Sequence, residues 1–148
     1  MEQENSSKWV PSRQAIIVLA MIIVLAASVA SVSYAFTFFQ VCLSAPTVSF
    51  TIVMTQEGFN GSLNHNDPWP VLSVPRCSRV TVHLMNQDVN NQEHGFAITH
   101  YFDGGVQLRP GQSHDVVFSA NKAGSFLIYC NVICNIHLSM QNGRVNVT

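Results

Sequence analysis

Two thiols, an imidazole and a thioether fall within eleven residues near the C-terminus, as Cys130, Cys134, His137 and Met140. Sulfur ligands combined with imidazole suit copper, and a distant thioether is a common weak axial ligand of copper electron-transfer sites. Calcium and magnesium prefer carboxylates, which residues 129–140 do not contain. This stretch therefore predicts a copper site.

A further strong ligand has to come from elsewhere in the chain. His94 is the best placed of the six histidines, because it stands at the start of a predicted strand. The ligand stretch follows one predicted strand and precedes the last, so a single loop can fold around a metal. Four other histidines lack a partner at metal-ligand spacing and are interpreted as surface or structural residues: His65, His83, His100 and His114.

The combined motif resembles the copper A domain of cytochrome c oxidase subunit II and of nitrous oxide reductase. The resemblance covers roughly residue 71 to the C-terminus and rests on His94-Gly95-Phe96 together with Cys130-x3-Cys134 and His137-x2-Met140. It implies a cupredoxin fold and two copper ions bridged by both cysteine thiolates. It also implies one histidine for each copper and two weak ligands, so that the full set is His94, Cys130, Val132 through its carbonyl, Cys134, His137 and Met140.

Two features depart from the family pattern. Only two residues separate Cys134 from His137, one fewer than usual, and this spacing matches a mononuclear blue-copper loop as in amicyanin, with Cys130 as a bystander. We favour the binuclear interpretation, because a free thiol beside a copper–thiolate centre is an oxidation liability. Many family members carry an acidic residue at the position of Val132 that helps to hold magnesium, so we expect no magnesium contribution here.

Such a centre needs little rearrangement when one electron arrives or leaves, so the predicted task is electron relay. The sequence contains no nucleophile elbow, phosphate-binding loop or covalent haem motif, which favours a chain without a catalytic centre of its own. We expect a subunit of a haem–copper respiratory oxidase that takes electrons from an extracytoplasmic donor and passes them to the catalytic subunit. The alternatives are a membrane-anchored blue-copper carrier and a copper-delivery protein.

The elements that position these ligands are predicted to be short strands. After about residue 46 the apolar pattern alternates with period two, and turn-forming residues interrupt it at regular intervals. This pattern is typical of an all-β Greek-key sandwich or barrel. The expected strands are residues 47–54, 71–74, 79–85, 95–101, 114–119, 124–129 and 143–147.

The N-terminal part is of a different kind, because no charged residue occurs between Arg13 and Glu57 and residues 15–36 are almost wholly apolar or small. We predict a transmembrane helix over residues 15–38, long enough to cross the lipid core. Lys8 and Arg13 precede it, so residues 1–14 are expected in the cytoplasm and residues 39–148 outside. A cleavable signal peptide ending near residue 35 is the alternative, and it also exports the remainder.

Four further expectations concern contacts and partners. Cys42 and Cys77 lie in the exported part, where a disulfide between them is one possibility. The small residues 26–33 are expected to pack against another transmembrane helix, next to membrane lipid. Trp69 is interpreted as a packed turn residue, with a place near an electron-entry surface as the alternative. The net charge of −1 indicates no nucleic-acid partner.

Overall fold

The computed structural model describes residues 12–148, apart from the side chains of residues 37–41. It divides into two units, Met1–Gln40 and Val41–Thr148. Most of the segment predicted to be cytoplasmic, residues 1–14, lies outside the described residues.

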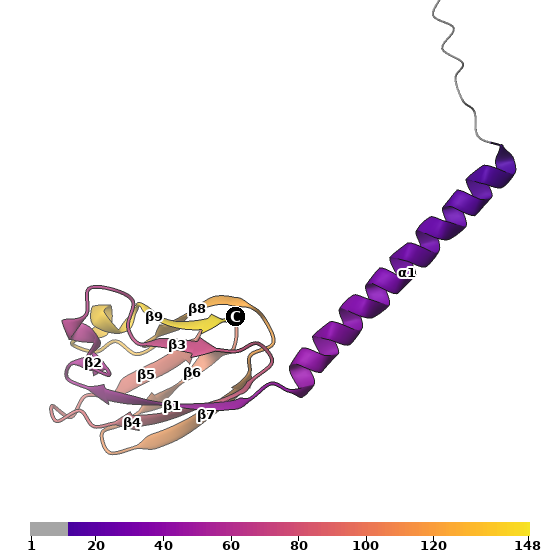
Figure 1. Ribbon diagram of the computed structural model, residues 1–148. Coiled ribbons are helices and arrows are strands. Elements are labelled where there is room, and N and C mark those ends of the chain that lie inside the picture. The colour runs from indigo at the N-terminus through magenta and orange to yellow at the C-terminus, as the bar shows by residue number, and fades with distance from the viewer. Residues whose placement is uncertain (1–11) are drawn as a thin grey trace, which may run out of the picture. The chain divides into compact units, whose positions relative to one another are not determined.

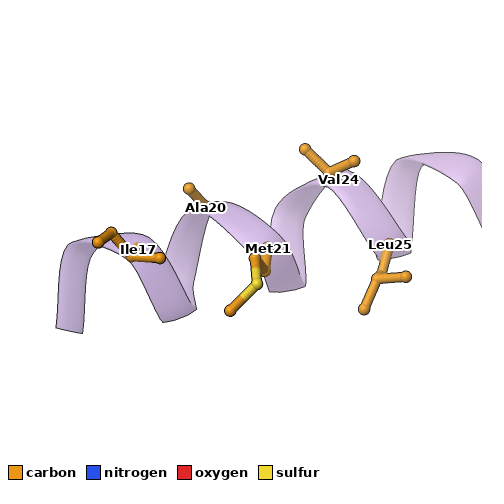
Figure 2. Close-up of a pocket in the computed structure, with 5 residues that line it drawn as sticks. All are labelled: Ile17, Ala20, Met21, Val24 and Leu25. Atoms are coloured by element: carbon orange, nitrogen blue, oxygen red, sulfur yellow. The ribbon is translucent and has the colours of Figure 1, made fainter. Parts of the chain in front are cut away.

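The first described element is the helix α1 (Arg13–Leu43), which is longer than the predicted residues 15–38. By length and composition its part Arg13–Phe36 is apolar enough to cross a membrane, and the side chains there are exposed. One face of the helix has a shallow hollow (Figure 2), lined only by Ile17, Ala20, Met21, Val24 and Leu25. Since these side chains are all apolar, the hollow offers no chemistry.

The unit Val41–Thr148 is a sandwich of two mixed β-sheets (Figure 1). The four-stranded sheet has the order β2-β1-β4-β7, with β1 (Thr47–Thr55), β2 (Gly58–Phe59), β4 (Arg79–Asn86) and β7 (Ser113–Ser119). The five-stranded sheet has the order β3-β9-β8-β5-β6, with β3 (Val71–Val74), β5 (His94–Ile98), β6 (Phe102–Leu108), β8 (Gly124–Tyr129) and β9 (Gly143–Val147). The structure confirms the predicted β-sandwich, which follows one apolar helix in the sequence.

The core lies between the two sheets, where alternate residues of each strand point inward. In β4 the residues Val80, Val82 and Leu84 are fully buried, and the residues between them are not. The alternation follows from the strand pleat, which sends successive side chains to opposite faces. The buried rings of Phe59 and Phe96 meet edge to face with centroids 5.7 Å apart, which brings the short β2 against β5.

Two strands of the five-stranded sheet bring the predicted ligands together. The neighbours β5 and β8 are antiparallel, and Ala97 pairs with Tyr129. The start of one antiparallel strand therefore meets the end of the other at the same edge of the sheet. His94 begins β5 and Cys130 directly follows β8, so both residues lie at this edge.

The sequence analysis placed one strand incorrectly. It continued a strand through residue 101 and expected no strand between residues 101 and 114, where Asp103, Gly104 and Gly105 locally favour a turn. In the structure β5 ends at Ile98, the chain reverses at residues 99–101 with His100 at φ 72°, and β6 carries both glycines. The strand β6 is largely exposed and lies at the edge of its sheet, where glycine is tolerated more readily than in a central strand.

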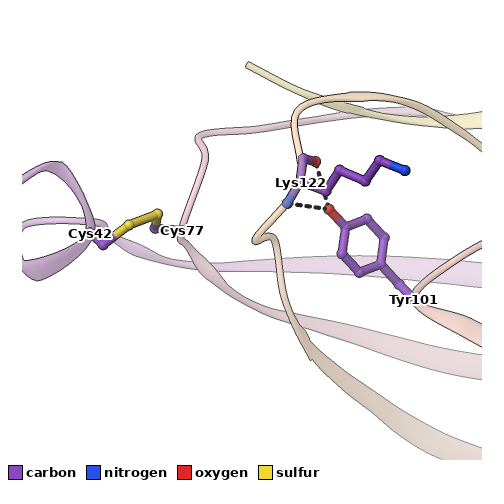
Figure 3. The surroundings of a disulfide bond; sticks show 4 residues. All are labelled: Cys42, Cys77, Tyr101 and Lys122. Carbon is purple, nitrogen blue, oxygen red and sulfur yellow. Dashed lines mark hydrogen bonds between the residues drawn. A yellow bond between two sulfur atoms is a disulfide. The ribbon is translucent and has the colours of Figure 1, made fainter. Parts of the chain in front are cut away.

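The chain enters the sandwich at the end opposite the His94 edge. The disulfide that the sequence left open is formed, and it joins Cys42 to Cys77 across 35 residues of sequence (Figure 3). Nearby, the Tyr101 hydroxyl donates to the Lys122 carbonyl at 2.7 Å and accepts from the Lys122 amide at 3.1 Å. The disulfide therefore fixes the start of the domain beside the turn that precedes β4.

Candidate metal centre

Three of the predicted ligands form a tight group at the edge shared by β5 and β8. One ring nitrogen of His94 and the Sγ atoms of Cys130 and Cys134 all lie within 4.8 Å of one another. His94 and Cys130 are almost fully buried, and Cys134 is partly buried. Two thiols and an imidazole from segments far apart in sequence thus converge on one point.

His94 is held by a buried carboxylate. Its Nε2 atom lies 2.9 Å from Oδ2 of Asp88, and the two side chains are 0% and 1% exposed. Nδ1 of His94 has no hydrogen-bond partner, although it is buried. Since Nε2 is engaged by Asp88, Nδ1 is the nitrogen left to face the two thiols.

His94 and Asp88 each shift the pKa of the other in the direction that favours its charged form. Burial by itself lowers the pKa of His94, but the influence of the neighbouring Cys130 thiol and of Asp88 outweighs burial and raises that pKa above its ordinary value. Burial by itself raises the pKa of Asp88, but hydrogen bonds from His94 and from two backbone amides lower it below its ordinary value. Asp88 is therefore a carboxylate at neutral pH, and it favours a proton on Nε2 of His94.

The two thiols differ in their surroundings. The amide of Gly95 lies 3.2 Å from Sγ of Cys130, and this sulfur also lies 3.0 Å from the Val132 carbonyl oxygen. Burial raises the pKa of Cys130, but the neighbouring imidazole of His94 and the hydrogen bond from the Gly95 amide outweigh burial and lower the pKa to about 7. Burial and the neighbouring Cys130 raise the pKa of Cys134 to about 11. One thiolate is therefore readily formed beside His94.

The remaining predicted ligands surround this group. Nδ1 of His137 lies 2.8 Å from the carbonyl oxygen of Val132, and Sδ of the buried Met140 lies 4.0 Å from Sγ of Cys134. His137 contributes no atom to the 4.8 Å group within the described residues. The structure therefore brings His94, Cys130 and Cys134 together directly, and it places Val132, His137 and Met140 in contact with that group.

The ligand loop is closed on itself by hydrogen bonds. The Cys130 amide donates to the Met140 carbonyl at 2.8 Å, which ties the two ends of the loop together. The side-chain amide of Gln141 donates to the Cys130 carbonyl at 2.9 Å, and it lies 3.2 Å from Nε2 of His137. The turn of 3-10 helix His137–Met140 lies inside this closure. The two ends of the ligand loop are therefore held together by hydrogen bonds of the chain itself.

Several supporting residues were missed by the sequence analysis. Asp88 precedes His94 by six residues and sits in a polar loop, where an acidic residue is expected to face solvent. Gln141 follows the motif and carries no ligand chemistry of its own. Gly95 is part of the sequence motif, but only the structure shows its role. A Cβ at this position would overlap the Asn131 side chain and lie 3.0 Å from the Asn131 amide nitrogen. The glycine is therefore required for the loop to approach β5.

The other four histidines lie outside this group within the described chain. His65 stacks on the ring of Trp69, and His100 stacks on Phe126. His83 pairs with Asp115 on the exposed face of the four-stranded sheet, with 2.7 Å between Nδ1 and the carboxylate oxygen. These contacts agree with the interpretation of these residues as surface or structural.

Three solved structures superpose on a large part of this chain. Copper nitrite reductase of Nitrosomonas europaea superposes with a TM-score of 0.52 at 20% identity, over 68% of this chain and 41% of that one. Auracyanin of Roseiflexus castenholzii gives 0.52 at 16% identity, over 70% and 99%. A multicopper oxidase gives 0.53 at 20% identity, over 67% and 41%. The domain has a cupredoxin-like fold. At these identities the superpositions establish the fold alone.

Sequence similarity to a curated protein extends over less than half of the chain. Nitrous-oxide reductase of Pseudomonas fluorescens is 31% identical over 70 residues, which is 46% of this chain and 11% of that protein. The chain therefore spans about a tenth of the curated relative that it matches. No family model matches the chain.

Proposed function

We propose that the cupredoxin-like domain binds copper at the His94 edge and relays electrons. The observation that carries this proposal is the buried group of His94, Cys130 and Cys134, in which one imidazole nitrogen has no partner and two thiols stand beside it. A buried polar nitrogen without a hydrogen bond is costly unless a ligand satisfies it. A donor set of two thiols and an imidazole fits copper.

We propose further that the centre is of the binuclear copper A type. The position of Cys130 supports this proposal, because its sulfur lies in the same 4.8 Å group as His94 and Cys134. In this proposal Cys130, Cys134, His94 and His137 would hold two copper ions, and Met140 and the Val132 carbonyl would be weak ligands. When bound, copper supplies a site that accepts and donates single electrons.

The chain's own residues hold the ligands in place and keep water out. The ligand loop is closed by its backbone hydrogen bonds, so little movement is needed when the charge of the site changes. Phe96, Cys130 and Met140 belong to the same buried apolar cluster, so the inner side of the ligand group is apolar. A ligand set that is fixed and largely shielded favours electron transfer over ligand exchange.

We propose that the chain serves a haem–copper respiratory oxidase as an electron-accepting subunit. The helix α1 is long and apolar enough to be a membrane anchor. The disulfide Cys42–Cys77 suits an oxidising, extracytoplasmic compartment. Three apolar side chains at the ligand end are exposed, Val89, Ile133 and Leu138, and we propose that an electron donor docks at this end.

A mononuclear blue-copper carrier is the second candidate. The short spacing from Cys134 to His137 favours it, and so does the contact of 4.0 Å between the sulfurs of Cys134 and Met140. In this alternative His94, Cys134, His137 and Met140 hold one copper ion, and Cys130 acts only as a neighbouring thiol.

Copper analysis combined with electron paramagnetic resonance of the oxidised, full-length chain distinguishes these candidates. We expect two copper ions per chain and a hyperfine pattern shared over both nuclei. Replacing either thiol, as Cys130→Ser or Cys134→Ser, is expected to abolish the native spectrum. One copper per chain, with Cys130→Ser retaining colour and potential, would replace the binuclear proposal with the mononuclear one. Failure of the wild-type chain to bind copper would overturn both.

The partner and the orientation are tested separately. After gentle detergent extraction, the chain should co-migrate with a haem-bearing oxidase when complexes are separated by size. A haem-free species of the chain's own size, with oxidase activity retained elsewhere, would remove the subunit assignment. Protease added to intact cells or spheroplasts should digest the domain, and protection there would reverse the proposed orientation.

A further inference from the structure

The loop between β4 and β5, residues 87–93, is organised around two buried polar side chains. The amide group of Asn86 donates to the carbonyls of Leu108 and Gln92 at 2.7 Å and 2.9 Å. Oδ1 of Asp88 accepts from the amide of Asn90 at 2.7 Å and from that of Gln92 at 3.4 Å. The loop is therefore folded back onto Oδ1 of Asp88. The other carboxylate oxygen, Oδ2, accepts none of these loop hydrogen bonds.

That second oxygen contacts the ring of His94. Oδ2 of Asp88 lies 2.9 Å from Nε2 of His94, and both side chains are almost completely buried. The Asp88 amide donates to Oδ1 of Asn86 at 3.0 Å, which fixes the carboxylate from the backbone side. The ring of His94 is thus held at the nitrogen that faces away from the thiols.

We propose that Asp88 is the residue that positions His94 for copper, by accepting a hydrogen bond from Nε2–H and so leaving Nδ1 without a proton toward Cys130 and Cys134. This inference rests on the proposed copper function. A carboxylate behind a metal-binding histidine fixes the ring's tautomer and orientation and makes the nitrogen that faces the metal a better ligand. The negative charge of Asp88 also stabilises the more oxidised, more positive state of the centre, so it lowers the reduction potential.

A purely structural role for Asp88 makes different predictions. If Asp88 only folds the loop, a short side chain that accepts from the Asn90 amide is enough to replace it. Serine can accept such a local hydrogen bond, but its side chain is too short to reach His94. The variant Asp88→Ser therefore keeps the turn and removes the contact with the histidine. Asp88→Asn removes the charge at nearly constant shape.

The chain offers a matched control in Asp115. This residue pairs with His83 at 2.7 Å, and the pair lies on the exposed face of the four-stranded sheet. The variant Asp115→Asn makes the same chemical change to a histidine–aspartate pair outside the ligand group. Any effect of charge removal on the whole domain appears in both variants, whereas an effect on the centre appears only in the Asp88 variants.

The experiment measures copper affinity against a competing chelator, midpoint potential and paramagnetic resonance of the full-length chain in detergent. For Asp88→Asn and Asp88→Ser we expect affinity to fall by about 10- to 100-fold, as is usual when the partner of a metal-binding histidine is lost. We also expect a higher midpoint potential and altered copper hyperfine splitting. Asp115→Asn should match the wild type in all three measurements.

The proposal is overturned if Asp88→Ser binds copper with unchanged affinity, potential and spectrum, because the turn alone then explains Asp88. A wild-type chain that binds no copper instead defeats the proposed function, so the two failures are distinguishable. If neither variant folds, nitrogen NMR of the metal-free wild-type chain decides. Protonation of His94 at Nε2 supports the proposal, and protonation at Nδ1 alone overturns it.

Discussion

Breaking the Cys42–Cys77 disulfide is expected to destabilise the domain without altering the copper site. The bond closes a loop with a sequence separation of 35 residues, for which the chain-entropy model gives about 13 cal/mol/K, or about 4 kcal/mol near 25 °C. Unfolding entropy is about 2.1 cal/mol/K per residue, or about 0.23 kcal/mol/K for a domain of about 108 residues, so the Tm should fall by about 17 °C.

The assay is thermal unfolding of Cys42→Ser, Cys77→Ser and the double variant, followed by circular dichroism in detergent. Since either single substitution removes the whole cross-link, all three variants should unfold at the same temperature. Cys77 has a φ of 67°, and serine carries a Cβ as cysteine does, so the backbone strain there is unchanged. The copper spectrum should also be unchanged, because Cys77 precedes β4 and the ligand group lies beyond the other end of that strand.

Two results would refute this reasoning. A double variant that unfolds within about 4 °C of the wild type, which corresponds to about 1 kcal/mol, would show that loop closure contributes little. A double variant that is clearly less stable than both single variants would show that the two side chains act through contacts other than their bond.

Further predictions concern the ligand end of the domain. Gly95→Ala should strain the ligand loop by about 1–3 kcal/mol and change the copper spectrum, because the added Cβ overlaps Asn131. The control Gly104→Ala, whose Cβ meets nothing within 4 Å, should behave as wild type. Equal effects of the two substitutions would contradict the role of Gly95. Phe59→Ala removes a fully buried ring and should cost about 3–5 kcal/mol in urea unfolding, whereas a loss below about 1 kcal/mol would count against its packing on Phe96. Removing copper with a chelator should lower the Tm. The loss of stability should be about 4 kcal/mol if copper was present at about 1,000 times its Kd. An unchanged Tm would mean that the folded state does not bind copper in preference to the unfolded state.

The parts of the fold that the sequence predicted well are those with a local, regular signal. The strands β3, β8 and β9 begin and end at the predicted residues, because each has alternating apolar residues between clear turn formers. The ligand loop was recognisable for a related reason, since Cys130, Cys134, His137 and Met140 are close in sequence and their spacing is itself the signal.

The parts that could not be predicted depend on contacts between distant segments. The edge strand β6 contains Asp103 and two glycines, which locally favour a turn, and only pairing with β5 makes it a strand. The buried position of Asp88 follows from the way its loop folds back, and no local pattern indicates a carboxylate inside a domain. The pairing of His83 with Asp115 likewise requires the register between β4 and β7.

The direction of β1 determines how far the ligand end can reach. The strand starts at Thr47, close after the disulfide, and its nine residues run toward the ligand end over about 27 Å, at about 3.3 Å per residue. If α1 is anchored beside a partner, a distance of this size keeps the ligand end at an effective concentration on the order of 10 mM near that partner. A docking interface with a Kd as weak as about 1 mM would then be occupied most of the time. The proposed electron-transfer contact can therefore be small and short-lived, and the anchor supplies the affinity that the contact lacks.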